Sequence, residues 1–250
     1  MGKKRKSNRA FLVALTLGLM LLLGWGFYYW YPRIVRYPGF GIHIPPGYGI
    51  HGIDVSHYQG RINWKEVVNM NTHGIGIRFC FIKASEGISL TDDRFAGNWQ
   101  NAKKAGISRG AFHYFTAGID GALQAKKFLS IVPLEKGDLT PVVDIEEANG
   151  LSRNALVRSL SDWLRVVEQR CGKKPIIYTG ANFYAQYLQG DFDDYPLWVA
   201  HYFAPLGPRI SRPWQFWQHS ERGRVNGIAN KVDFNVFNGD QSDFDNLLLN

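Results

Sequence analysis

Between Ile50 and Phe237, short apolar runs alternate with amphipathic stretches, and this alternation limits the folds open to the chain. Repeated strand–helix units imply a parallel sheet with helical crossovers. We expect strands at 49–56, 78–84, 109–115, 139–146, 174–179, 197–202, 214–219 and 231–237. We expect helices at 63–70, 92–105, 119–132, 152–170 and 182–188, and a short closing helix within 240–250.

Eight strands in a domain of about 200 residues predict a closed α/β barrel whose last part lacks full helices. An open doubly wound sheet is the alternative. It would normally carry a glycine-rich phosphate loop after the first strand, but the segment 54–60 holds one glycine, Gly60. If the barrel is right, the active site lies where the carboxyl ends of the strands open.

The segment 141–147 (PVVDIEE) places Asp144 and Glu146 two residues apart in an apolar, β-branched run. On a strand, positions i and i+2 point to the same face. Two acids on one face repel each other, and such a pair is what hydrolysis of a glycosidic bond requires. The alternative is an edge strand with a solvated acidic face, which Val142, Val143 and Ile145 disfavour because they are too apolar.

The net charge of +8 is concentrated at the amino terminus. Five of the 29 basic residues lie before residue 10 and no acid lies in 1–30, so that 31–250 carries 24 basic and 21 acidic residues. This balance does not indicate binding to nucleic acid. The two cysteines, Cys80 and Cys171, form no disulfide framework and no metal-binding spacing, and leave open one disulfide or two free thiols.

Residues 10–30 are uncharged, mostly apolar and long enough to span a bilayer as a helix. The basic residues in 1–9 favour a cytoplasmic amino terminus, and an aromatic cluster at the far end is typical of a membrane interface. This cluster contains Trp25, Phe27, Tyr28, Tyr29, Trp30 and Tyr31. We expect an uncleaved, single-pass signal-anchor rather than a cleaved signal peptide, because bulky aromatic residues follow the weak Gly24-Trp25-Gly26 site.

These features divide the chain into a cytoplasmic tail (1–9), a membrane anchor (10–30), a linker rich in proline and glycine (31–49) and a catalytic domain (50–250). The domain would then lie outside the cytoplasm, in the periplasm or at the cell surface. We expect it to act as a monomer.

The motifs at the strand ends resemble those of glycoside hydrolase family 25, the muramidases also called Chalaropsis-type lysozymes. The matching segments occur in the family's order at 52–59 (GIDVSHYQ), 81–87 (FIKASEG), 110–115 (GAFHYF), 141–146 (PVVDIE), 176–179 (IIYT), 197–200 (LWVA), 216–218 (FWQ) and 232–235 (VDFN). The resemblance implies a flattened TIM-like barrel of about five strand–helix units and three further strands. It also implies cleavage of the β-1,4 bond between N-acetylmuramic acid and N-acetylglucosamine in peptidoglycan, without a cofactor.

By the matching motif at 141–146, the resemblance implies that Glu146 is the general acid, with a pKa raised by burial and by a neighbouring charge. Asp144 is its ionised partner, and Asp54 and Asp233 shape the site and bind sugar. The resemblance favours retention, and leaves open whether Asp144 or the substrate's N-acetyl group is the nucleophile. Aromatic residues near the strand ends are expected to contact sugar: Tyr58, Tyr114, Tyr178, Trp198, Tyr202 and Trp217.

Other chemistries fit the sequence less well. His51, Asp54, His57, His113 and His201 could be drawn as a metal set, but no His-x-x-x-His pair exists, so we expect no catalytic metal. His57 and His113 are expected to donate hydrogen bonds near the cleft or pack against it, and Glu86 to pair with Lys83. The rival functions are a non-catalytic glycan-binding module and a hydrolase of another N-acetylated glycan such as chitin.

Overall fold

The structure, a computed structural model, describes residues 3–30, 35–204 and 207–250. Tyr31 of the expected aromatic cluster, and residues 1–2 and 32–34 of the expected tail and linker, lie outside this range. The described chain divides into two units, the amino-terminal helix and a compact unit that begins at Val35. The helix α1 (Lys3–Trp30) contains a stretch, Arg9–Tyr28, that is long and apolar enough to cross a membrane.

Eight strands of the compact unit close into a barrel, as predicted. Their order is β3-β12-β11-β10-β9-β8-β7-β5, and β5 pairs with β3 to complete the ring. Neighbours are parallel except at β12, which runs antiparallel to both β11 and β3. The barrel strands are β3 (Ile50–Val55), β5 (Ile75–Glu86), β7 (Ser108–Tyr114), β8 (Val142–Asp144), β9 (Ile176–Gly180), β10 (Leu197–Ala200), β11 (Phe216–Gly223) and β12 (Val232–Phe237).

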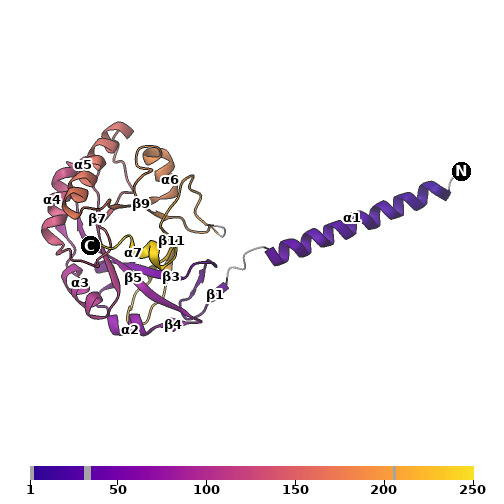
Figure 1. Cartoon of the computed structure of the whole chain (residues 1–250), viewed down its shortest axis with the longest axis horizontal. Helices are drawn as coiled ribbons and strands as arrows, with labels where there is room; N and C mark the ends of the chain where they lie inside the picture. Colours follow the sequence, from indigo (N-terminus) through magenta and orange to yellow (C-terminus); the bar gives the residue numbers. More distant parts are fainter. Residues whose placement is uncertain (1–2, 31–34, 205–206) are drawn as a thin grey trace. The chain divides into compact units, whose positions relative to one another are not determined.

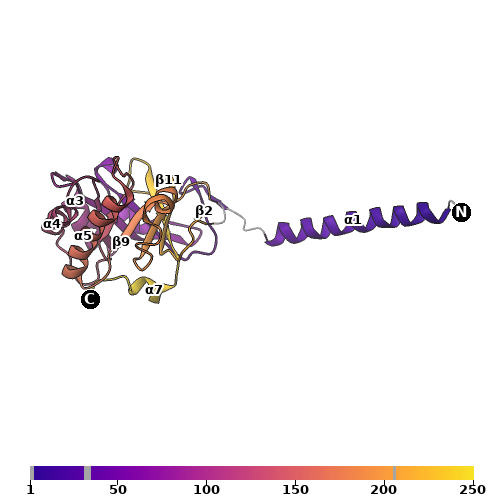
Figure 2. The same ribbon diagram turned by 90° about the horizontal axis from the view of Figure 1, so that it is seen from above.

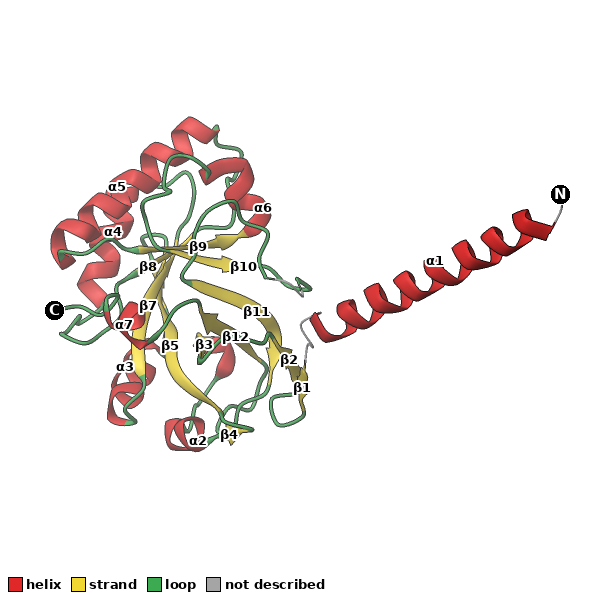
Figure 3. Cartoon of the chain, turned by 45° about the vertical axis from the view of Figure 1, so that its right-hand side comes forward, coloured by secondary structure: helices red, strands yellow, loops and turns green. Residues whose placement is uncertain are grey.

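Helices follow the first five barrel strands and lie outside them (Figure 3). They are α2 (Trp64–Asn69), α3 (Phe95–Lys104), α4 (Gly121–Ile131), α5 (Arg153–Cys171) and α6 (Ala181–Phe183). The helix expected at 182–188 is instead the short α6 followed by a π-helical turn, η2 (Tyr184–Leu188). Two-residue strands, β4 (Asn71–Thr72) and β6 (Leu90–Thr91), flank β5. The five strand–helix units and three further strands are confirmed.

Two apolar layers hold the barrel together. The outer layer lies between strands and helices, and the inner layer fills the barrel with aromatic rings such as Phe79, Phe81 and Phe216. Burying each such ring contributes about 1.5–3 kcal/mol. The rings leave no room for side chains at Gly52 and Gly110, where a Cβ atom would lie 2.5 Å from Phe79 and 2.6 Å from Phe81.

The carboxy-terminal helix α7 (Gln241–Asp245) covers one end of the barrel. It lies at the centre of the ring of strands in Figure 1 and at one edge of the unit in Figure 2. Phe244 of α7 packs against Phe237, at the end of β12, with ring centroids 5.2 Å apart. Because β12 runs against the other strands, this is the end where those strands begin. The carboxyl ends of the parallel strands therefore open at the opposite end.

The segment 31–49 was expected to be a linker, but from Val35 onward it belongs to the compact unit. Strands β1 (Val35–Tyr37) and β2 (Ile42–Ile44) form an antiparallel hairpin. Phe40, Ile42 and Ile44 are buried, and the Phe40 ring lies 4.9 Å from that of Phe234 on the barrel. The compact unit therefore begins before Ile50, because this apolar hairpin packs on the barrel wall. Cys80 is buried and Cys171 partly buried, and both are free thiols.

Candidate active site

A cleft of about 310 Å³ lies at the carboxyl ends of the barrel strands. It brings together all four acids expected there and five of the six expected aromatic residues. The predicted residues that line it are Asp54, Tyr58, Tyr114, Asp144, Glu146, Tyr178, Trp198, Tyr202 and Asp233. The geometry of this end of the barrel therefore collects groups that lie up to 179 positions apart in the sequence, from Asp54 to Asp233.

Asp144 and Glu146 share one face, although the strand is shorter than expected. β8 ends at Asp144, but the backbone stays extended because Ile145 N–H donates to the carbonyl of Tyr178 at 3.0 Å. Val143 and Ile145 pack in the outer layer, so the alternation turns Asp144 and Glu146 into the cleft. Asp144 is 6% exposed, whereas Glu146 is open to the cleft.

The two carboxyl groups face the same cleft and influence each other's protonation, and Asp144 Oδ1 is buried without a hydrogen-bond partner among the described residues. Burial, with the negative charge of Glu146, raises the pKa of Asp144 well above its usual range. Partial burial also raises the pKa of Glu146, while the neighbouring Asp144 carboxyl opposes the shift. Both carboxyl groups therefore have raised pKa values, and the pair disfavours carrying two negative charges.

Asp54 is held as an acceptor by two amide groups. Its Oδ2 accepts hydrogen bonds from Gln218 Nε2 at 2.9 Å and from Asn235 Nδ2 at 2.7 Å. Burial raises the pKa of Asp54 to about 6, and the two donors limit that rise. Asp54 is therefore ionised at neutral pH, despite its burial.

Asp233 lies directly opposite Asp54 in the register of β12 and β3. Burial, and then the negative charge of Asp54, raises the pKa of Asp233 to about 9. Of the two, Asp233 is the one whose pKa is raised further. The cleft consequently contains two pairs of carboxyl groups with raised pKa values.

Gln218 and Asn235 are oriented by aromatic donors on the other side of their amides. The hydroxyls of Tyr178 and Tyr202 donate to Gln218 Oε1 at 2.8 Å and 2.6 Å. Trp198 Nε1 donates to Asn235 Oδ1 at 2.8 Å. These bonds turn both NH₂ groups toward Asp54. The sequence prediction missed both amides, although Asn235 stands at i+2 from Asp233 and shares its face.

The aromatic residues differ in what they can offer a sugar. Tyr58 is 71% exposed, and its ring can be covered by a ligand. Trp198 is the floor of the cleft, because Phe81 and Tyr178 lie against its indole with ring centroids 4.4 Å away. The prediction for Trp217 was wrong. It is 2% exposed and packs in the outer layer, because alternation along β11 turns the neighbouring Gln218 inward.

One cation faces these acids from within the lining of the cleft. Lys83 Nζ lies 2.7 Å from Glu86 Oε2, which confirms the expected ion pair, and 4.9 Å from the centroid of the Tyr114 ring. Its positive charge lowers the pKa of both Asp144 and Glu146, against the larger effect of burial.

The histidines serve packing and hydrogen bonding. His57 Nδ1 lies 3.0 Å from Asp92 Oδ2, and His113 Nδ1 lies 2.8 Å from Ser85 Oγ while its ring stacks on Trp163. Within the described residues, no group of three or more His, Cys, Asp or Glu side chains is arranged to hold a metal ion.

Comparisons with known proteins agree with this geometry. The model of the family described as glycosyl hydrolases family 25 matches residues 53–228. An uncharacterized protein, YegX, of Escherichia coli O6:H1 is 50% identical over 200 residues, which are 80% of this chain and 74% of that protein. Lysozyme M1 of Streptomyces globisporus is 37% identical over 206 residues, with 76% of this chain and 68% of that protein covered. A solved family 25 glycosyl hydrolase from Bacillus anthracis superposes with a TM-score of 0.75 at 33% identity, covering 83% of this chain and 97% of that one.

Proposed function

Since this chain belongs to glycosyl hydrolase family 25 and is a glycoside hydrolase of the muramidase kind, we propose that Glu146 is its general acid. The bond proposed to be cut is the β-1,4 bond between N-acetylmuramic acid and N-acetylglucosamine of peptidoglycan. The observation that carries this proposal is the pair Asp144 and Glu146, both with raised pKa values, in a cleft lined by aromatic side chains. A carboxyl group must hold a proton near neutral pH to protonate a leaving sugar oxygen.

Substrate binding supplies the step that places the proton on Glu146. A sugar in the cleft expels water from the exposed Glu146 carboxyl, which penalises its charged form and raises its pKa. Glu146 then holds the proton that the glycosidic oxygen needs. Asp144 is the ionised partner next to the reacting carbon, as the transition state requires.

The closeness of the two carboxyl groups bears on the nucleophile. Flanking carboxyls lie about 5–5.5 Å apart in retaining enzymes and about 6.5–9.5 Å apart in inverting ones. Asp144 and Glu146 project from the same face of one segment into the cleft, so they approach a sugar from the same side. This favours the substrate's own acetamido oxygen as nucleophile, with Asp144 orienting that group and ionised Asp54 stabilising the positive charge.

Gln218→Leu tests the role assigned to Asp54. The change removes one of the two donors that lower the pKa of Asp54, so this pKa should rise above about 6. If ionised Asp54 is needed, the acidic limb of the pH–rate profile moves to higher pH. At pH 6 we expect kcat/KM to fall by roughly tenfold to a hundredfold, because each pKa unit is worth about a factor of ten.

The measurement is the rate of peptidoglycan hydrolysis from pH 4 to 9. Gln169→Leu, on the exposed surface of α5, is the control and should match the unmodified protein. A lower rate with an unshifted acidic limb would show that Gln218 has a structural role and that the protonation of Asp54 is irrelevant.

The helix α1 is proposed to anchor the enzyme in the cytoplasmic membrane, with the catalytic unit outside the cytoplasm. Its span Arg9–Tyr28 is apolar enough for this, and basic residues precede it. The full chain should stay with membranes during alkaline carbonate extraction, and a chain lacking residues 1–30 should not. Recovery of a shortened chain from cells, seen by intact mass, would show instead that α1 is a cleaved signal.

A further inference from the structure

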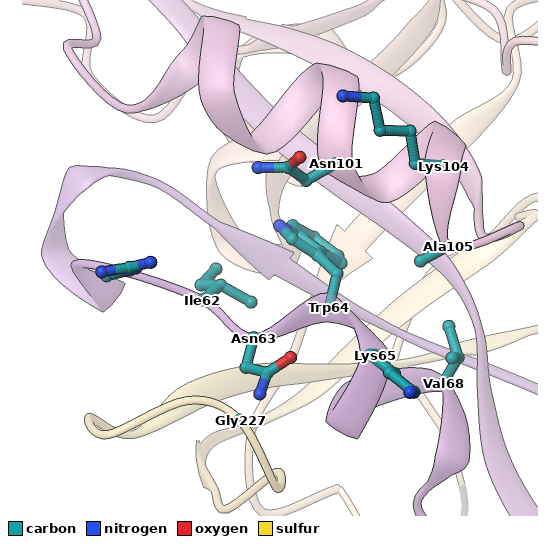
Figure 4. Close-up of a pocket in the computed structure, with 10 residues that line it drawn as sticks. Ile62, Asn63, Trp64, Lys65, Val68, Asn101, Lys104, Ala105 and Gly227 are labelled. Atoms are coloured by element: carbon teal, nitrogen blue, oxygen red, sulfur yellow. The ribbon is translucent and has the colours of Figure 1, made fainter.

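A second concave site lies on the outer wall of the barrel, beside the cleft and separate from it. Its volume is about 780 Å³, against about 310 Å³ for the cleft. Figure 4 shows it between α2 and α3, with Trp64 between Asn101 on one side and Lys65 on the other, and with the Gly227 loop along its lower edge. We call it the basic groove, because three of its ten lining residues are cations: Arg61, Lys65 and Lys104.

The basic groove carries more positive than negative charge. Its lining holds no carboxylate and all three cations are exposed, while one carboxylate at its edge, Glu66, accepts a hydrogen bond from Asn63 Nδ2 at 2.8 Å. Across the described chain, none of the three side chains makes an ion pair or hydrogen bond, whereas the adjacent Lys103 is paired with Glu135. Unpaired cations gathered in a concave surface favour a ligand with several negative charges.

The floor of the basic groove is apolar and rigid. Trp64 is 4% exposed, and its indole N–H donates to Asn98 Oδ1 at 3.3 Å. Ile62 is buried beside it and Val68 partly buried. Alternating apolar and cationic surface suits a short peptide with carboxylates and small apolar side chains better than it suits a bare polyanion.

The basic groove and the cleft lie on two sides of one chain segment. Tyr58 and Gln59 line the cleft, whereas Arg61 and Asn63 line the groove. The loop between β11 and β12 holds this segment in place, since Asn230 Nδ2 donates to Tyr58 O at 2.7 Å and Asn63 N–H donates to Gly227 O at 2.8 Å. Gln59 of the cleft and Arg61 of the groove are two positions apart, so their Cα atoms are separated by about 7 Å at most. The groove therefore begins within reach of a group that branches from a bound sugar.

We infer that the basic groove binds the carboxylate-bearing stem peptide of peptidoglycan while the glycan lies in the cleft. This rests on the proposed function, because muramic acid is the sugar that carries the peptide. The groove would then make the enzyme prefer glycan strands that still carry their peptides over stripped strands.

The test compares two substrates and two matched variants of the full chain in neutral detergent. One variant neutralises the groove (Arg61→Gln, Lys65→Gln, Lys104→Gln). The other removes the same charge from exposed, unpaired side chains of the described surface elsewhere (Lys126→Gln, Lys136→Gln, Arg158→Gln). The substrates are peptidoglycan with its stem peptides and the same glycan after an amidase has removed them. Surface charge pairs each contribute modestly, so three together should change KM by roughly tenfold.

We expect the groove variant to show about a tenfold higher KM on peptide-bearing strands at low salt, an unchanged KM on stripped strands and an unchanged kcat on both. The control variant should match the unmodified protein on both substrates. An equal loss on both substrates, or no loss on either, would overturn the inference. Inhibition by polyphosphate that the groove variant loses, without discrimination between the two substrates, would assign the groove to phosphate polymers and also overturn it.

If no variant cleaves either substrate, the proposed function fails, and binding of the isolated stem peptide then decides the inference separately. Titration of the free tetrapeptide, followed by calorimetry, should show binding that the groove variant loses and the control variant keeps. Equal binding by both variants would overturn the inference.

Discussion

Glu146→Gln is expected to lower kcat for peptidoglycan hydrolysis by about a thousandfold, within the range that a general acid contributes. Glutamine keeps the size of the side chain but cannot protonate the leaving oxygen. KM should change little, because the amide still fits the cleft. The measurement is the release of reducing ends from purified peptidoglycan.

Two comparisons separate proton donation from a structural effect. Asp93→Asn changes an exposed carboxylate outside the cleft lining and should leave the rate close to normal. An aryl glycoside with an acidic phenol needs no proton on its leaving group, so Glu146→Gln should lose far less activity on it than on peptidoglycan. Equal losses on both substrates would show that Glu146 does not act as the acid.

Asp144→Asn is expected to abolish most activity and at the same time to stabilise the fold at neutral pH. Burial raises the pKa of Asp144 well above its usual range, so the folded state disfavours the charged carboxylate that the unfolded chain carries. For a carboxyl with a raised folded pKa, the stability contribution is full below the unfolded pKa and is lost as the pH rises through the folded value. An asparagine at position 144 carries no charge at any pH, so the variant does not lose this stability as the pH rises.

We expect the Asp144→Asn variant to gain about 1–2 kcal/mol at pH 7, a typical gain when functional strain is relieved. In a domain of this size, this corresponds to about 2–8 °C in Tm. The gain should shrink as the pH is lowered through about 4, the pKa of an aspartate in the unfolded chain, because below it both states of the unmodified protein hold the proton. Thermal unfolding followed by circular dichroism at several pH values measures it.

Asp138 provides a matched control for that substitution. It is 5% exposed against 6% for Asp144, but its carboxylate is paired with Arg109, with a Nε–Oδ1 distance of 2.7 Å. Asp138→Asn should therefore lower Tm, because it leaves the buried guanidinium with only the more distant, half-exposed carboxylate of Glu135 at 3.9 Å. If Asp144→Asn also lowers Tm at neutral pH, Asp144 is a structural residue and its assigned role is wrong.

The sequence predicted the barrel because its periodicity is local. Each strand is a short apolar run followed by a turn or an amphipathic helix, and the eight expected strands are all present. The hairpin β1–β2 was missed because Phe40, Ile42 and Ile44 lie among prolines and glycines, and their burial depends on contacts with distant Phe234.

For the candidate site, the sequence predicted which acidic and aromatic residues at the strand ends come together. The four acids and five of the six aromatic residues line one cleft. Trp217 was predicted to contact sugar because it lies near a strand end. That prediction did not take into account that side chains alternate along β11, which turns Gln218 toward the cleft and Trp217 away from it. The pKa shifts of the acids could not be read from the sequence, because they depend on the burial of Asp144 and on the amide donors that face Asp54.

The mass of the fragments released from borohydride-reduced digests of peptidoglycan tests the central claim most directly. If the chain is a muramidase, each fragment carries a reduced N-acetylmuramic acid at its new end, and chitin oligomers incubated in parallel remain intact. Fragments that end in reduced N-acetylglucosamine, or cleavage of chitin at a comparable rate, would contradict the account.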